Sequence, residues 1–145
     1  MFPMPYALHS IARRLADSNN AGVTKKVMLV DDNPAIRQAL HKVFELQSDW
    51  AVCGEAANGR EGIEQAKVLK PDLIVLDVSM PGMNGLEAAR VIHAMMPKVP
   101  LILCSLYADE VLGREAKSAG VVAVFSKTQN LERLVSKAAE LLRAS

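Results

Sequence analysis

Five short apolar runs, separated by stretches with helical periodicity, constrain the fold of this chain more than any other feature. The runs cover residues 27–30, 51–54, 73–76, 101–104 and 121–125, and the helical stretches cover 34–46, 58–69, 84–96, 108–118 and 129–143. Strands that alternate with helices make right-handed βαβ crossovers, which build a parallel sheet with helices on both faces. The runs are continuously apolar, which is typical of strands buried on both sides. We therefore expect an α/β fold with a doubly wound, five-stranded parallel sheet and five helices.

Residues 1–24 are expected to be a flexible extension in front of a single domain that covers 25–145. Residues 17–24 are polar and rich in turn-forming side chains, which is typical of a linker. Apolar side chains at positions 8, 11, 12 and 15 recur at helical spacing beside two arginines, which would also suit a short amphipathic docking helix. A disordered extension is the preferred interpretation.

The composition disfavours several classes of partner. Seventeen basic and sixteen acidic side chains nearly balance, so no overall positive field favours nucleic acid or an anionic membrane. Aromatic residues make up only 4%, too few for a base-stacking platform. No apolar run approaches the roughly 20 residues that span a bilayer, and the N-terminus shows no secretory signal. We expect a cytoplasmic domain that binds neither membrane nor nucleic acid directly.

Acidic, hydroxyl and ammonium side chains follow four of the apolar runs. They are Asp31 and Asp32, then Asp77, then Ser105, and finally Lys127. Ligands of open α/β sheets bind just beyond the carboxyl ends of the strands, so these side chains are expected at one rim. Each carboxylate pair there would repel by roughly 4 kcal/mol at an effective dielectric near 20, and a cation would relieve this.

A few hard oxygen ligands suit Mg²⁺ better than zinc, which predicts Mg²⁺ as the cofactor. An aspartate can act as a nucleophile toward phosphorus and form an aspartyl phosphate. A lysine and a hydroxyl on the opposite side from the metal would neutralise the oxygens of the transferred group. The pattern therefore predicts a divalent-cation and phosphoryl site.

The residues themselves resemble the receiver domain of bacterial two-component response regulators. The resemblance rests on residues 27–34 (VMLVDDNP), residues 76–85 (LDVSMPGMNG), Ser105 and Lys127, and it covers about residues 25–143. It implies a flavodoxin-like fold with strand order 2-1-3-4-5, an order for which a chemotaxis receiver is a standard example. Residues 55–59 and 85–90 look most like receivers that precede a helix-turn-helix output domain.

Carried over by position, the resemblance makes Asp77 the phosphoacceptor. Asp32 corresponds to the direct Mg²⁺ ligand beside it, and Asp31 would act through water. The backbone carbonyl of Ser79 matches the third protein ligand. Residues 80–85 would form the turn beneath the site.

Ser105 and Lys127 match the hydroxyl and the lysine that bind the phosphoryl group in the family. Ser79 and Tyr107 flank the site and could tune hydrolysis of the phosphorylated form; loop packing is an equal alternative. Val124 stands at the switch position, where the family usually has Tyr or Phe, and Phe125 follows it on the opposite face of the strand. Thr128 follows the lysine where many members have a cis proline, so a trans bond is expected.

Simpler interpretations exist for each residue alone. Asp31 and Asp32 could cap the next helix, Asp77 could be a turn residue, and Lys127 could be a solvated surface charge. Their coincidence at strand ends favours the phosphoacceptor. Haloacid-dehalogenase-type phosphatases also form an aspartyl phosphate but need a second acid two residues later, where this chain has Ser79. Flavin binding is disfavoured because three carboxylates would repel its phosphate.

Two further expectations concern cysteine and histidine. In strand order 2-1-3-4-5, Cys53 and Cys104 lie three strand spacings apart, roughly 14 Å, which is too far for a disulfide. Buried, reduced thiols are therefore expected. His41 and His93 show no ligand spacing and are expected on exposed helix faces.

The sequence thus predicts a phosphorylation-controlled switch rather than an enzyme. A histidine kinase or phosphotransfer protein would phosphorylate Asp77 in the presence of Mg²⁺. Output would pass through protein contact or through a DNA-binding domain outside this chain, with a monomer or a phosphorylation-dependent dimer as the active form. The alternative is a non-phosphorylated pseudo-receiver that serves as an interaction module.

Overall fold

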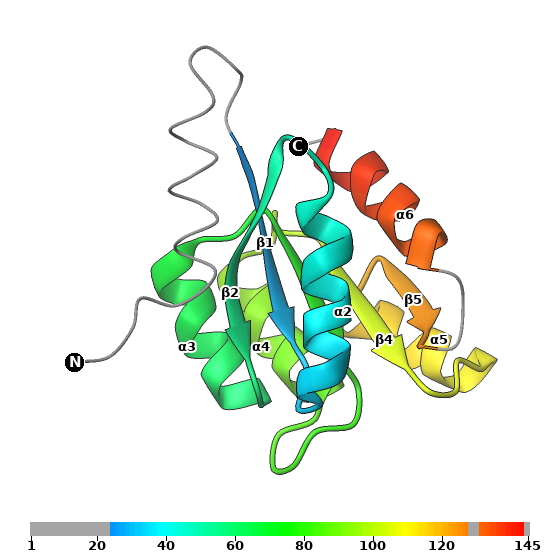
Figure 1. Ribbon diagram of the computed structural model, residues 1–145. Helices are drawn as coiled ribbons and strands as arrows, with labels where there is room; N and C mark the ends of the chain where they lie inside the picture. Colours follow the sequence, from blue (N-terminus) through cyan, green and yellow to red (C-terminus); the bar gives the residue numbers. More distant parts are fainter. Residues whose placement is uncertain (1–23, 128–130, 144–145) are drawn as a thin grey trace.

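The computed structural model describes residues 24–127 and 131–143, which form alternating strands and helices (Figure 1). The strands are β1 (Lys25–Val30), β2 (Trp50–Ala56), β3 (Leu73–Asp77), β4 (Leu101–Ser105) and β5 (Ala123–Ser126). The helices are α2 (Pro34–Glu45), α3 (Gly59–Leu69), α4 (Gly85–Met95), α5 (Glu110–Ser118) and α6 (Leu131–Arg143). The expectations for residues 1–23 and for Thr128 lie outside the described part of the chain.

The strands form one parallel sheet in the order β2-β1-β3-β4-β5, which confirms the flavodoxin-like topology. Helices α2 and α6 pack on one face, and α3, α4 and α5 cover the other (Figure 1). Strand order reverses beside β1, because β2 lies on one side of β1 and β3 on the other. This point of reversal, at the carboxyl ends of β1 and β3, is where ligands bind in such sheets.

Both faces of strands β1 to β4 are mostly buried, as the continuously apolar runs predict, while the edge strand β5 is half-buried. In β1, Val27 and Leu29 face the core beneath α2 and α6, while Met28 and Val30 face the core beneath α3, α4 and α5. All four side chains are at most 1% exposed. Burial from two sides holds the strand ends firmly, so the side chains that follow them have fixed positions.

Side-chain caps begin the helices close to the predicted residues. The side chains of Asn33, Asn58 and Asn84 accept hydrogen bonds from the first turns of α2, α3 and α4. Each bond satisfies a backbone N–H that the helix itself leaves unpaired. These caps fix the first residues of α2, α3 and α4.

The start of β5 differs most from the prediction of a strand over 121–125. The Val121 N–H donates to the Ala116 carbonyl at 2.9 Å, and Gly120 adopts a φ of +91°. Residue 121 therefore still belongs to the turn that ends α5, and the strand begins two residues later. Such helix-ending turns use the left-handed conformation that glycine adopts most easily.

Cys53 and Cys104 are free, buried thiols on β2 and β4, two strands with β1 and β3 between them. Burial raises the pKa of Cys53 to about 11 and that of Cys104 to about 12. The expectation of unpaired, buried cysteines is confirmed. Among the described helices, none has the length and apolar character needed to cross a membrane.

Candidate functional site

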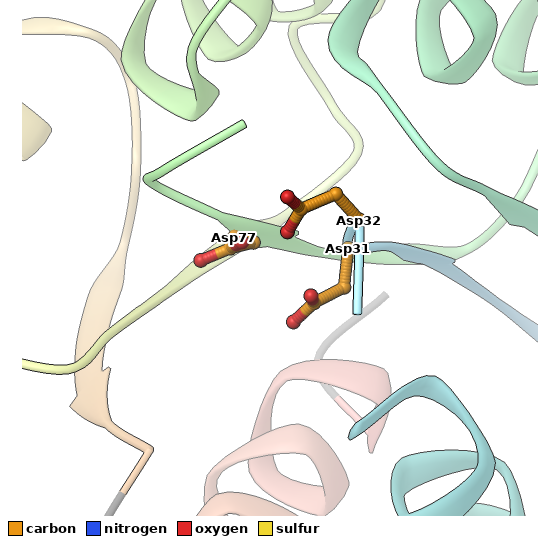
Figure 2. Close-up of side chains that lie close together, drawn as sticks. All are labelled: Asp31, Asp32 and Asp77. Carbon is orange, nitrogen blue, oxygen red and sulfur yellow. The ribbon is translucent and has the colours of Figure 1, made fainter. Parts of the chain in front are cut away.

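Three carboxylates gather at the carboxyl ends of β1 and β3, the two strands at the centre of the reversal (Figure 2). Asp31 and Asp32 come directly after β1, and Asp77 is the last residue of β3. One carboxylate oxygen from each lies within 4.8 Å of the others. Asp31 and Asp77 are buried, and Asp32 is exposed. The three acidic side chains predicted at this rim are thus brought together.

The backbone after β1 is shaped by hydrogen bonds from Asp31 and Asn33. The Asp31 N–H donates to the Ala56 carbonyl at 3.0 Å, which extends the pairing with β2 by one residue. The Asn33 N–H then donates to Asp31 Oδ1 at 2.9 Å, while the Asn33 side chain caps α2. The chain therefore turns from strand to helix within three residues and leaves both acids at the rim.

The turn after β3 depends on glycine. The Gly85 N–H donates to the Val78 carbonyl at 2.9 Å, and a Cβ at residue 85 would collide with the Asp77 carbonyl oxygen. Gly82 adopts a φ of +75°, in the region that glycine enters without steric cost. These glycines let residues 80–85 fold back beneath Asp77, as the sequence predicts.

Lys127 crosses from the end of β5 to the acidic group. Its Nζ lies 2.8 Å from Asp77 Oδ1 and 3.1 Å from Asp31 Oδ2. Its backbone N–H donates to the Ser105 carbonyl at 2.7 Å, which fixes the start of the side chain beside β4. Burial alone would lower the pKa of Lys127, but its hydrogen bonds to Asp77 and Asp31 raise it above the usual value.

The electrostatics of Asp77 favour a bound cation. Burial raises the pKa of Asp77 to about 6; the Asp31 charge acts in the same direction and the Lys127 ammonium opposes both. Among the described residues, the buried Oδ2 of Asp77 has no hydrogen-bond partner. Three carboxylates and one ammonium leave an excess of negative charge, and oxygen donors of this kind suit Mg²⁺. The donor set therefore fits the Mg²⁺ site that the sequence predicts.

Ser105 and Ser79 lie beside the acidic group. The buried Ser105 hydroxyl donates to the Tyr107 carbonyl at 2.9 Å and accepts from the Tyr107 N–H at 3.2 Å. Within the described residues, it makes no hydrogen bond to the side chain of Asp77 or Lys127. The Ser79 N–H donates to Asp77 Oδ1 at 3.3 Å, and the Ser79 and Tyr107 side chains are exposed.

Val124 and Phe125 face opposite sides of β5, as strand geometry predicts. Val124 packs against the core beneath α3, α4 and α5, and Phe125 against the core beneath α2 and α6. Phe125 therefore lies on the opposite face of the strand from Val124, and it cannot take the place of an aromatic residue at position 124.

The sequence did not reveal a polar network behind the acidic group. Arg37 on α2 donates from Nη1 to the Asp31 carbonyl at 2.6 Å, and its Nε lies 3.4 Å from Glu55 Oε1. His41 Nδ1 lies 2.9 Å from Glu55 Oε2. The expectation of an exposed His41 is wrong: the residue is 5% exposed, because its side of α2 faces Glu55 on β2. The only available signal was the spacing of four between Arg37, His41 and Glu45, which places them on one helix face.

Comparison with known proteins gives a consistent result. The sequence pattern of the response regulator receiver domain matches residues 27–139. The chain is 36% identical over 114 residues to the chemotaxis protein CheY of Thermotoga maritima, covering 76% of this chain and 94% of that protein. It is also 36% identical over 110 residues to the uncharacterized transcriptional regulatory protein YxjL of Bacillus subtilis, covering 76% of this chain.

The matched segment covers only 50% of YxjL, so the chain spans about half the length of that regulator. Among solved structures, it is similar to a LuxR-family two-component response regulator from Aurantimonas, with a TM-score of 0.79 and 27% identity. That similarity covers 83% of this chain and 86% of the other. The resemblance to receivers of transcription regulators is thereby confirmed.

Proposed function

This chain belongs to the response regulator receiver family, and on that premise we propose that it is a phospho-accepting switch with Asp77 as the phosphoacceptor. One observation carries the proposal: the buried Oδ2 of Asp77 has no hydrogen-bond partner among the residues that the structure describes, while Oδ1 lies 2.8 Å from Lys127 Nζ. An unsatisfied buried oxygen is costly unless a ligand or a reaction partner uses it. The receiver is proposed to span residues 25–145.

The proposed reaction is transfer of a phosphoryl group from a phosphohistidine of a histidine kinase or a phosphotransfer protein. An oxygen of the Asp77 carboxylate attacks phosphorus, and the phosphorus–nitrogen bond breaks with its electron pair on the imidazole, which takes a proton from solvent. Lys127, already 2.8 Å from Asp77, would neutralise a phosphoryl oxygen. Bound Mg²⁺ would supply the remaining charge neutralisation.

The hydrogen bonds of Asp31 support different roles for the two neighbouring acids. Asp31 Oδ1 accepts from the Asn33 N–H, and Asp31 Oδ2 faces Lys127. Asp31 is therefore proposed to act on Mg²⁺ through water, and the exposed Asp32 directly. Asp77 and the backbone carbonyl of Ser79 are proposed to complete the protein ligands.

The signal is proposed to begin at Ser105. Its hydroxyl would exchange its bonds to the Tyr107 backbone for a bond to the phosphoryl group, which gives the loop after β4 two arrangements. Val124 cannot follow as an aromatic switch, so the loop itself is proposed to carry the change to a partner surface. Ser79 and Tyr107 are proposed to tune hydrolysis, and output passes to a partner protein or an attached DNA-binding domain.

The test uses a small acyl phosphate as donor with Mg²⁺, and measures phosphate uptake by intact-protein mass spectrometry. The native chain is expected to gain one phosphoryl group, and Asp77→Asn none. Asp49→Asn, the same substitution in an exposed turn, serves as the control and is expected to match the native chain. Equal uptake by Asp77→Asn would refute the assignment, and no uptake by the native chain would favour a pseudo-receiver.

A further inference from the structure

Arg37 reaches from α2 to the backbone that joins the two acids of the site. Its Nη1 donates to the carbonyl of Asp31 at 2.6 Å, and this carbonyl belongs to the peptide group between Asp31 and Asp32. Arg37 is half-buried, with 21% of its side chain exposed. A charged hydrogen bond with restricted access to water is stronger than an exposed one.

Every polar atom of Asp31 has a partner within hydrogen-bond or ion-pair distance. The N–H donates to the Ala56 carbonyl, the carbonyl accepts from Arg37, and the carboxylate oxygens face the Asn33 N–H and Lys127. Asp32 is different: it follows the sheet and its side chain is exposed. Since a peptide group is planar, the bond from Arg37 to the Asp31 carbonyl fixes the plane from which Asp32 projects.

Glu55 and His41 hold Arg37 in turn. Glu55 lies on β2, and its carboxylate places Oε1 3.4 Å from Arg37 Nε and Oε2 2.9 Å from His41 Nδ1. The hydrogen bond with His41 is the main reason that the pKa of Glu55 is lowered, so Glu55 stays ionised as a partner for Arg37. The chain of contacts runs from His41 through Glu55 and Arg37 to the backbone carbonyl of Asp31.

We propose that Arg37 is a positioning residue for the divalent-cation site, which it serves by orienting the Asp31–Asp32 peptide while Glu55 holds its guanidinium. The inference rests on the proposed function of the acidic group, and Arg37 and Glu55 are not among the residues proposed to bind the cation or the phosphoryl group. Partners behind metal ligands commonly change metal affinity by about 10- to 100-fold when they are removed.

Charge and positioning predict opposite results for the loss of Arg37. Removing a nearby positive charge would by itself strengthen binding of a divalent cation, since like charges repel. Losing the bond to the Asp31 carbonyl would instead weaken binding, because the peptide and Asp32 are no longer oriented. The sign of the change in Mg²⁺ affinity therefore separates the two effects.

The experiment titrates MgCl₂ into the whole chain by isothermal titration calorimetry, with no phosphoryl donor present. Arg37→Met is expected to weaken Mg²⁺ binding by about tenfold or more, and Arg37→Lys, which keeps the charge but not the planar fork, to weaken it too. Arg60→Met is the control, because Arg60 is exposed on α3, and it should leave the affinity unchanged. Native or tighter binding by Arg37→Met would overturn the proposal.

A second variant tests the role of Glu55, and it offers a milder change in case Arg37→Met fails to fold. Glu55→Gln keeps the shape of the side chain and is expected to weaken Mg²⁺ binding less than Arg37→Met does. The double variant should bind no more weakly than Arg37→Met alone, because Glu55 acts through Arg37. If the losses of Mg²⁺ affinity in the two single variants add up in the double variant, Glu55 does not act through Arg37.

The last measurement is the rate of phosphate uptake as a function of Mg²⁺ concentration. Arg37→Met should need more Mg²⁺ for half-maximal uptake but reach the native maximal rate, because Arg37 touches no reacting atom. A reduced maximal rate with native Mg²⁺ affinity would contradict positioning. If the native chain binds Mg²⁺ but takes up no phosphate, the proposed function fails, while the comparison of affinities still decides the role of Arg37.

Discussion

We expect ionised Asp77 to destabilise the metal-free fold at neutral pH, and its replacement by asparagine should reveal by how much. The side chain is 2% exposed, and its ionised form has lost most of its hydration. Burial, with the Asp31 charge in support, raises the pKa of Asp77 from 3.8 to about 6 in spite of the contact with Lys127. The folded chain therefore keeps the proton on Asp77 to a higher pH than the unfolded chain does, and asparagine imitates the protonated carboxyl in shape and charge.

This pKa corresponds to about 3 kcal/mol against the ionised form in the folded state, at 1.36 kcal/mol for each pH unit. The folded-state pKa lies above the unfolded-state value, so the stabilisation is fully present below about pH 4 and is lost as the pH rises through about 6. Lys127 loses an ionic partner in Asp77→Asn but keeps Asp31. Because this pKa already includes the attraction of Lys127, we expect the variant to gain about 3 kcal/mol at neutral pH.

The assay is urea unfolding of native and Asp77→Asn chains in EDTA, near pH 7.5 and near pH 4. The difference in the free energy of unfolding should be largest at the higher pH and close to zero at the lower one. Asp49→Asn, in an exposed turn, should show little difference at either pH. Added Mg²⁺ should stabilise the native chain more than the variant, because a ligand stabilises only the state that binds it. An equal or less stable Asp77→Asn near pH 7.5 would refute the reasoning.

Three more results follow from the site and the core. Lys127→Met should take up phosphate much more slowly than the native chain in the acyl phosphate assay, because the ammonium 2.8 Å from Asp77 is lost. Gly85→Ala should lower the free energy of unfolding by about 1–3 kcal/mol or more in urea titrations, because its Cβ would collide with the Asp77 carbonyl. Cys53 and Cys104 should react with a thiol reagent near neutral pH only after unfolding, because burial raises the pKa of both.

Matched controls make these outcomes decisive. Gly113→Ala, at a position in α5 where a Cβ meets nothing within 4 Å, should be neutral or stabilising, since alanine favours helix. Lys117→Met on exposed α5 should leave phosphate uptake unchanged. Native uptake by Lys127→Met, native stability of Gly85→Ala, or rapid thiol reaction in the folded chain would contradict the respective argument.

The sequence predicted the α/β fold from its pattern, and the strand order that the family resemblance implies was enough to place the acidic group. Parallel strands place their carboxyl ends at one rim of the sheet. Polar residues that follow two neighbouring strands must therefore lie close together. To predict that Asp31, Asp32 and Asp77 lie together, only the pairing of β1 with β3 had to be known. Lys127 needed in addition a side chain long enough to pass β4, and its contact with Asp77 agrees with that prediction.

Side-chain orientation was not predictable to the same degree. The direction of the Ser105 hydroxyl depends on the loop that follows β4, where the Tyr107 backbone offers both a donor and an acceptor. His41 looks like a surface residue by type, yet Glu55 on β2 supplies a partner that makes its burial favourable. Such cross-element pairs depend on helix rotation and sheet register, which apolar periodicity fixes only approximately.

The charges at the rim explain why the switch would respond to phosphorylation and not only to metal. Three carboxylates and Lys127 sum to −2, so a bound Mg²⁺ brings the group to neutrality. On the proposed function, phosphorylation replaces the Asp77 carboxylate by a group of roughly −2 and returns a net negative charge. Mg²⁺ and Lys127 would then already be engaged, and the Ser105 hydroxyl, which here donates to the Tyr107 carbonyl, is the donor proposed to meet the added charge. On the proposed function, a neutral metal-bound state would leave the loop after β4 in place, and the added phosphoryl charge would draw the Ser105 hydroxyl away from the Tyr107 backbone.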